Sequence, residues 1–176
     1  GSTNTLLSIS ESLNAGNTSE AKAKATELRA HYDQFLTELY STPAGLGKGQ
    51  AIVEKEFNFI DSLIATAPYT GKQEKEMVAL GELLSTQIFE AFLQEEGVSS
   101  ALLPALDFMV IDEDNEPVLS VIEQKLAAVL APVKGKQIYV TQGFICRNPA
   151  GEVDNLKRGG SDYSASLIAA AVNASV

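Results

Sequence analysis

The chain has 176 residues, of which 45% are hydrophobic and 20% charged, so it is long enough for one domain with a buried core. Its formal net charge of −10 and its 13 dispersed basic residues disfavour a nucleic-acid partner, because phosphate backbones are bound by clustered Lys and Arg. No apolar run reaches the ~18 residues of a membrane span, and the single Cys146 cannot form an intrachain disulfide, so we expect a cytoplasmic protein without a membrane contact.

The first half of the chain is predicted to be helical. Apolar residues recur at helical spacing within residues 6–13, 28–39, 53–64 and 77–88. The breaks between these helices are expected at residues 15–17, in a glycine-rich loop at 45–49, and at Pro68. The last of the four helices should run from about Lys72 to Glu96 and be ended by Gly97.

Beyond residue 97 the pattern changes to short apolar runs separated by helical segments. Strands are predicted at 98–103, 108–111 and 137–146, and helices at 118–130 and from 163 to about 173. Strands that alternate with helices favour an α/β fold with a parallel sheet, in which ligands lie at the carboxyl ends of the strands.

The most specific segment is 140–164, which reads VTQGFICRNPAGEVDNLKRGGSDYS. It places Arg158, Gly159, Gly160, Ser161 and Asp162 directly before a helical pattern. Glycines allow close approach of the backbone, and free N–H groups point outward at a helix start, so a pocket for a small anionic substrate is plausible. The alternatives are an exposed loop arginine, a serine N-cap and a first-turn acid.

Three motifs carry a resemblance to a known family. Segments 140–145 and 156–164 resemble the substrate-binding segment of aspartate kinase, a member of the amino-acid kinase family. The sequence TNTLL at 3–7 is similar to the family's threonine-asparagine motif, and LGELLS at 80–85 is similar to its glycine-glutamate-x-x-serine motif. The motifs occur in the family's order and span almost the whole chain.

The resemblance implies a three-layer αβα fold with a mainly parallel sheet, of which this chain would be a helix-rich, truncated portion. We interpret residues 1–2 as an expression scar and residues 3–176 as a partial kinase domain that holds the substrate-binding half. The lysine motif and the nucleotide-binding half of the family would then be absent. The isolated chain is therefore expected to be inactive.

The function implied by the resemblance is ATP-dependent phosphorylation of the β-carboxylate of L-aspartate, the first step towards lysine, threonine and methionine. ATP and Mg²⁺ would serve the intact enzyme, and neither is expected to be bound to this chain. L-aspartate is the expected partner. Uncovered strand edges would favour self-association, so a homo-oligomer is an open alternative.

The resemblance also assigns roles within the segment 158–162. Arg158 would bind a carboxylate of aspartate through two parallel hydrogen bonds, a geometry that a lysine cannot reproduce. Gly159, Gly160 and Ser161 would contact the substrate, and Asp162 would lie close to the reacting groups as the catalytic residue.

Two further substrate-binding residues come from the first half of the chain. Glu82 lies on an apolar helical face, where an acid either turns to solvent or is drawn inward by a cationic partner. By resemblance it would receive the α-ammonium of aspartate, so that Glu82 and Arg158 would hold opposite ends of a zwitterion. Thr3 is the remaining substrate-binding residue, and no metal ligands are predicted in the chain.

Two positions depart from the family pattern, which has threonine-leucine-glycine where this chain has Asn155-Leu156-Lys157. Lys157 replaces a glycine, which makes a positive φ at this position less expected. Phe144, Tyr163 and His31 receive no role. Two alternative functions stay open: another amino-acid kinase, such as a glutamate kinase, and a non-catalytic helical module that binds a partner through its apolar stripes.

Overall fold

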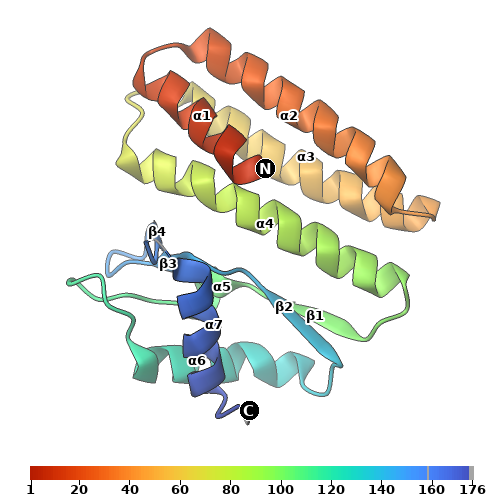
Figure 1. Ribbon diagram of the computed structural model, residues 1–176, viewed down its shortest axis with the longest axis vertical. Helices are drawn as coiled ribbons and strands as arrows, with labels where there is room; N and C mark the ends of the chain where they lie inside the picture. Colours follow the sequence, from red (N-terminus) through yellow and green to blue (C-terminus); the bar gives the residue numbers. More distant parts are fainter. Residues whose placement is uncertain (158, 175–176) are drawn as a thin grey trace. The chain divides into compact units, whose positions relative to one another are not determined.

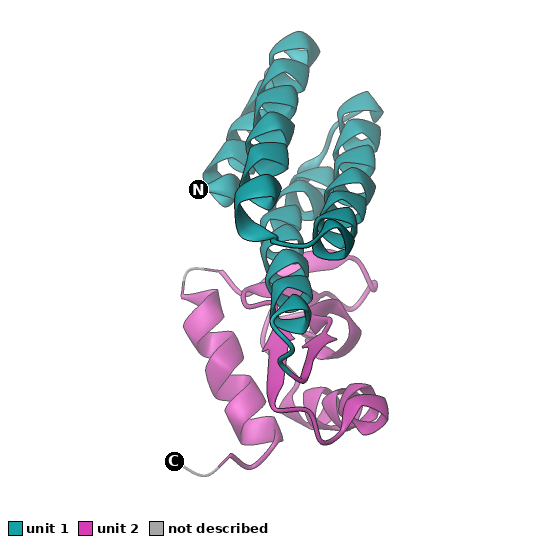
Figure 2. Ribbon diagram, turned by 90° about the vertical axis from the view of Figure 1, so that its right-hand side faces the viewer, with its two compact units in different colours: residues 1–98 teal, residues 99–176 magenta. Residues whose placement is uncertain are grey.

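The computed structural model describes residues 1–157 and 159–174. The chain divides into two compact units, unit 1 from Gly1 to Val98 and unit 2 from Ser99 to Val176, drawn in teal and magenta in Figure 2. Unit 1 is helical, and unit 2 contains the strands. Each unit is described by itself below.

Unit 1 consists of the helices α1 (Ser2–Asn14), α2 (Thr18–Leu39), α3 (Pro43–Ala65) and α4 (Gly71–Glu95), labelled in Figure 1. Helix α1 packs against α2 and α4, and α3 packs against the same two helices. The apolar residues that recur at helical spacing in the sequence form the core between them. Its fully buried members include Leu6, Ile9, Leu36, Phe57, Ile60, Leu80 and Leu84.

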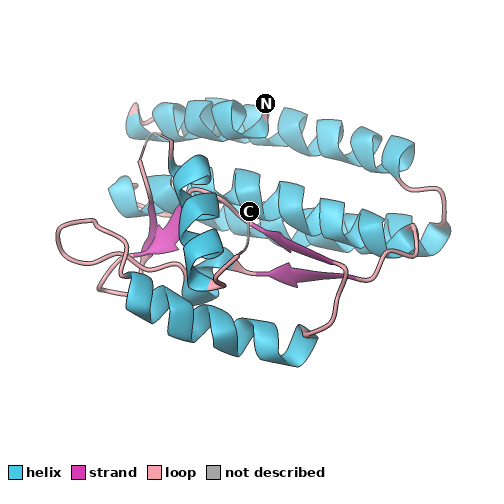
Figure 3. Ribbon diagram, turned by 60° about the horizontal axis from the view of Figure 1, so that its bottom comes forward, coloured by secondary structure: helices cyan, strands magenta, loops and turns pink. Residues whose placement is uncertain are grey.

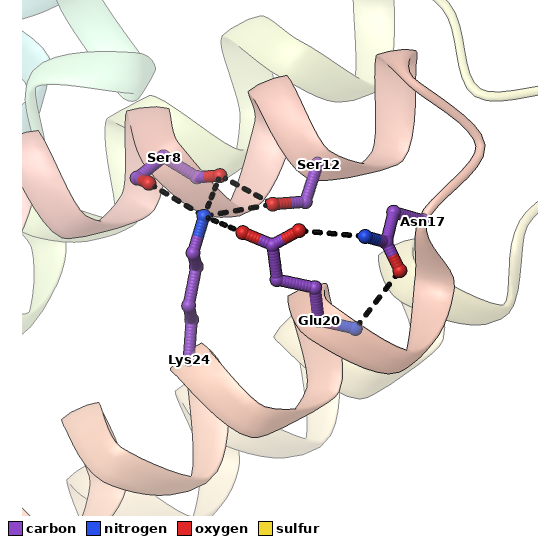
Figure 4. A network of polar contacts seen from close by, with 5 residues as sticks. All are labelled: Ser8, Ser12, Asn17, Glu20 and Lys24. Atoms are coloured by element: carbon purple, nitrogen blue, oxygen red, sulfur yellow. Dashed lines mark hydrogen bonds and ion pairs between the residues drawn. The ribbon is translucent and has the colours of Figure 1, made fainter.

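A lysine joins α1 to the start of α2. The Lys24 ammonium donates to the hydroxyls of Ser8 and Ser12, each at 2.8 Å, and forms an ion pair with Glu20 at 2.8 Å (Figure 4). The side chain of Asn17 caps α2 by accepting from the Glu20 backbone N–H at 3.4 Å. The hydrogen bond from Lys24 lowers the pKa of Glu20. This network fixes α1, which carries Thr3, against α2.

The loop predicted at 45–49 is wrong, because α3 already begins at Pro43. The hydroxyl of Thr42 caps the helix by accepting from the Gly45 N–H at 3.0 Å. Gly49 is buried against α2: a Cβ at this position would lie 2.5 Å from Cε2 of Tyr40. The glycines that suggest a loop therefore lie within a helix, where Gly49 permits close packing.

Two substitutions in α3 test this difference. Gly47 is exposed with open space around it, so Gly47→Ala should raise the free energy of unfolding by roughly 0.5–1 kcal/mol through helix propensity. Gly49→Ala should lower it by about 1–3 kcal/mol, because the new methyl group overpacks the contact with Tyr40. Urea unfolding measures both changes. No gain from Gly47→Ala would favour the loop.

In unit 2, strand β1 (Ser100–Leu103) pairs in parallel with β2 (Ile138–Thr141), with Ser100 opposite Ile138 and Leu103 opposite Thr141. The connection between the two strands contains α5 (Ala105–Phe108), α6 (Leu119–Leu130) and a 3₁₀ turn (Ala131–Val133). Parallel strands need such a crossover, and helices are the usual means. The strands are magenta in Figure 3.

The strand predicted at 137–146 is interrupted. Strand β2 ends at Thr141, and β3 (Ile145–Arg147) then pairs antiparallel with β4 (Val153–Asn155), a strand that was not predicted. At the interruption the Gln142 side chain accepts from the Ala105 N–H at 2.7 Å, and Phe144 adopts a φ of 69°.

The strand predicted at 108–111 is also wrong. Phe108 ends α5, and Val110 and Ile111 form only isolated bridges, to Arg147 and Pro117. The last helix is α7 (Gly160–Ala171), which packs near α6. The described elements confirm a helix-rich α/β fold. None of the described helices is both long and apolar enough to span a membrane.

Candidate functional site

The turn between β2 and β3 lies against the start of α7. A Cβ at Gly143 would lie 3.0 Å from both Cβ and Oγ of Ser161. A Cβ at Gly160 would lie 3.0 Å from Cδ2 of Phe144 and 3.1 Å from Cβ of Leu156. All of these distances are shorter than an ordinary side-chain contact, so glycine at 143 and at 160 lets the two segments meet.

The backbone on both sides of this contact adopts left-handed conformations. Phe144 has a φ of 69°, Lys157 a φ of 57° and Gly159 a φ of 79°. The expectation that Lys157 would avoid a positive φ is therefore wrong. The Asn155 side chain accepts from the Lys157 N–H at 3.3 Å and supports this conformation.

A pocket of about 260 Å³ opens at this contact. Its lining includes four of the predicted residues, Gly159, Gly160, Ser161 and Asp162, which the structure thus brings together. Phe144 and Lys157 also line it and were missed as site residues. The replacement of the family's glycine by Lys157 was the sequence signal from which this position could have been predicted as a site residue.

The pocket contains donors for an anion. Helix α7 begins at Gly160, three residues before the start at 163 expected from the sequence, and its N-cap is Gly159 rather than Ser161. Gly159 has no side chain with which to cap the helix, and among the described residues no side-chain cap bond to the first turn is found. The Ser161 side chain is exposed, and Lys157 adds a positive charge. These groups suit a carboxylate or phosphate oxygen.

Arg158 lies outside the described residues. Its predicted contact with a substrate carboxylate, and its predicted convergence with Glu82, therefore stay predictions. The described residues on either side of it, Lys157 and Gly159, both line the pocket.

The other two predicted residues lie in unit 1. Thr3 is half-buried on α1, and its Oγ1 lies 2.9 Å from the position that a Cβ on Gly81 would occupy. Gly81 thus allows α1 to approach α4 at Thr3. Glu82 follows on α4, so two of the motifs found in the sequence meet in space.

Glu82 is half-buried, and burial raises the pKa of its carboxyl. No neighbouring group among the described residues offsets this effect by donating a hydrogen bond or by ion pairing. Burial also raises the pKa of Tyr32, and the negative charge of Glu82 raises it further. A carboxylate held in this way is stabilised by a cationic ligand.

The raised pKa of Glu82 predicts a pH-dependent effect of Glu82→Gln on stability. Because the folded state favours the protonated carboxyl, the stability this group contributes is present below its unfolded pKa of about 4.3 and is lost as pH rises through the folded pKa. Glutamine mimics the neutral acid at every pH. The variant should therefore be more stable than the parent chain at about pH 7 and equal to it below about pH 4.

Urea unfolding of both chains at the two pH values measures this difference. The exposed Glu54, on α3, provides the control Glu54→Gln, for which we expect no such pH-dependent gain. A parent chain as stable as Glu82→Gln at the higher pH would contradict a desolvated carboxylate.

The described residues contain no group of three or more His, Cys, Asp or Glu side chains placed to bind a metal ion. The pocket residues Ser161, Asp162 and Lys157 offer a hydroxyl, a carboxylate and an ammonium group. Such groups bind and orient a small charged molecule.

An α/β chain with a polar pocket at the start of a helix, beside the carboxyl end of a parallel strand, is typical of enzymes that bind small anions. The family model described as the amino acid kinase family matches residues 7–176, and the chain belongs to this family.

Its named relatives are aspartokinases. The chain is 35% identical over 103 residues to the lysine-sensitive aspartokinase 3 of Escherichia coli, a match that covers 57% of this chain and 23% of that protein. It is 36% identical over 120 residues to the bifunctional aspartokinase/homoserine dehydrogenase 2 of the same organism, covering 67% of this chain and 14% of that protein. The resemblance to aspartate kinases is thereby confirmed.

The fold agrees with these relatives. The crystal structure of E. coli aspartokinase III in complex with aspartate and ADP matches 99% of this chain with a TM-score of 0.78 and 28% identity. The chain spans 39% of that protein chain. The aspartate kinase of Clostridium acetobutylicum, at 19% identity and a TM-score of 0.71, has the same fold over 97% of this chain.

Proposed function

We propose that this chain binds L-aspartate as part of an enzyme that transfers the γ-phosphoryl group of ATP to the β-carboxylate. The observation that carries the proposal is the pocket formed by the predicted residues 159–162 at the start of α7. The complex of the E. coli relative with aspartate and ADP supports the choice of aspartate and of an adenine nucleotide as the phosphoryl donor.

The proposed contacts divide by charge. The guanidinium of Arg158, the hydroxyl of Ser161 and the N–H groups at the start of α7 bind carboxylate oxygens. Glu82 binds the α-ammonium, which satisfies the charge of a half-buried carboxylate. Thr3, beside Gly81, supplies a further hydroxyl for the substrate.

The proposed reaction needs no general base. The β-carboxylate of aspartate has a pKa of about 3.9 and is ionised near neutral pH, so its oxygen is already a nucleophile. An oxygen lone pair forms a bond to the γ-phosphorus, while the bond from this phosphorus to the bridging oxygen breaks and its electrons stay on ADP. The chain's contribution is positioning and charge stabilisation, with Asp162 close to the reacting groups.

The nucleotide enters the proposal through the ADP complex of the E. coli relative, and Mg²⁺ enters it through the kinase family. We assign no metal ligand to the described residues and derive no step from the metal. The donors of the pocket are assigned to the substrate carboxylate, and no described residue is assigned to ATP. The proposal therefore concerns the amino-acid substrate of the reaction.

An assay of the complete protein that contains this chain tests the proposed activity. With ATP, Mg²⁺ and L-aspartate we expect an acyl phosphate, which hydroxylamine converts to a hydroxamate that can be measured. L-glutamate serves as the competing substrate. Turnover of glutamate in preference to aspartate would replace the proposal by a glutamate kinase, and no turnover of either would refute it.

Two variants separate the proposed contacts, with succinate as an aspartate analogue that lacks the ammonium group. Glu82→Gln should weaken L-aspartate binding by about 10- to 150-fold, the scale of a charged hydrogen bond, and leave succinate binding unchanged. Arg158→Ala should weaken the binding of both ligands. Calorimetric titration measures the affinities, with Glu54→Gln as the control. An equal loss of affinity for both ligands in Glu82→Gln would contradict the proposed contact between Glu82 and the α-ammonium.

A further inference from the structure

A buried serine joins the two segments that form the pocket of unit 2. Ser164 lies in the second turn of α7 with 1% of its surface exposed. Its hydroxyl accepts from the Phe144 N–H at 3.0 Å and donates to the Gly160 carbonyl at 2.7 Å. One hydroxyl thus ties the turn after β2 to the first residue of α7.

The residue held by this hydroxyl has an unfavourable backbone conformation. A φ of 69° is rare for a bulky aromatic residue, and such a conformation persists only where its surroundings enforce it. Phe144 is bonded on both sides: its N–H donates to Ser164, and its carbonyl accepts from the Leu156 N–H at 2.8 Å. Its ring lies against Gly160, and Phe144 is one of the residues that line the pocket.

The first turn of α7 is held at the same place. The Gly160 N–H donates to the Lys157 carbonyl at 3.1 Å, while the Gly160 carbonyl accepts from Ser164. Ser161 follows directly and packs on Gly143. Loss of the hydroxyl therefore removes one hydrogen bond from each wall of the pocket, at the Phe144 N–H and at the Gly160 carbonyl.

We infer that Ser164 is a positioning residue for the amino-acid substrate: it does not touch the substrate, but its hydroxyl holds Phe144 and the start of α7 in the geometry that binds a carboxylate. This inference rests on the proposed function, because it concerns the pocket assigned there to L-aspartate.

Three variants separate positioning from a general effect on the helix. Ser164→Ala removes the bridge. Ser164→Thr keeps a hydroxyl that a helical residue can direct to the carbonyl four residues earlier. Ser166→Ala is the matched control, because the exposed Ser166 donates to the Asp162 carbonyl at 3.0 Å in the same helix but has no bond to the β2–β3 turn in the described structure.

The experiment combines amide hydrogen exchange with calorimetric titration of L-aspartate and succinate into the 176-residue chain. We expect Ser164→Ala to accelerate exchange at the Phe144 amide while the amides of unit 1 keep their protection. Binding of both ligands should weaken about tenfold, because the altered groups meet the carboxylate. Ser164→Thr should restore most of the affinity, and Ser166→Ala should bind as the parent chain does.

Each outcome has a distinct meaning. Unchanged affinity in Ser164→Ala, with a parent chain that binds L-aspartate, would overturn the positioning role and leave the proposed function intact. Equal losses in Ser164→Ala and Ser166→Ala would also overturn it, because they indicate a general effect on α7. A parent chain that binds neither ligand would refute the proposed function and, with it, the positioning role.

Discussion

The close approach of the β2–β3 turn to the start of α7 is the constraint on which the pocket of unit 2 depends. Glycine at 143 and at 160 brings the two backbones to a distance at which any side chain would be crowded. The Ser164 hydroxyl then joins the two segments by accepting from the Phe144 N–H and donating to the Gly160 carbonyl. As a consequence, Phe144 adopts a left-handed backbone conformation, and α7 starts at a glycine N-cap that has no side-chain cap. The first-turn N–H groups of α7 are therefore available to a ligand in the pocket.

The chain is acidic overall, so an anionic substrate must be bound by local groups against the net charge of −10. The described pocket provides such groups in the first turn of α7 and in Lys157. In unit 1 the candidate group is negative rather than positive. Burial makes the charged form of Glu82 costly, and a cationic group of a ligand would relieve that cost. The zwitterionic amino acid proposed as the ligand carries both kinds of charge.

The sequence predicted α1, α2 and α4 well, because their apolar residues recur with a strict helical period and their ends carry turn residues. It failed at the start of α3, where glycines favour a loop by local preference but packing on Tyr40 decides for a helix. The division of the predicted strand 137–146 could not be foreseen, since it depends on the contacts of Gln142 and Phe144 with distant segments.

In the candidate site, too, residues grouped in one short stretch could be predicted from the sequence, whereas residues brought together by the fold could not. The pocket residues 159–162 were found from a motif, because glycines, a hydroxyl and an acid at a helix start have a chemical meaning in one short stretch. Phe144 and Ser164 were not found, since neither residue type indicates a role until the fold places the Ser164 hydroxyl beside the Phe144 N–H. The positive φ of Lys157 likewise depends on a bond from its own amide to Asn155.

The most direct test of the central claim is a titration of L-aspartate into the ¹⁵N-labelled chain, followed by the backbone amide signals. We predict that the signals of Phe144 and of residues 159–162 shift with the same saturation curve as that of Glu82. Saturable shifts confined to other residues, or no shifts at all, would contradict the claim that this pocket binds the amino-acid substrate.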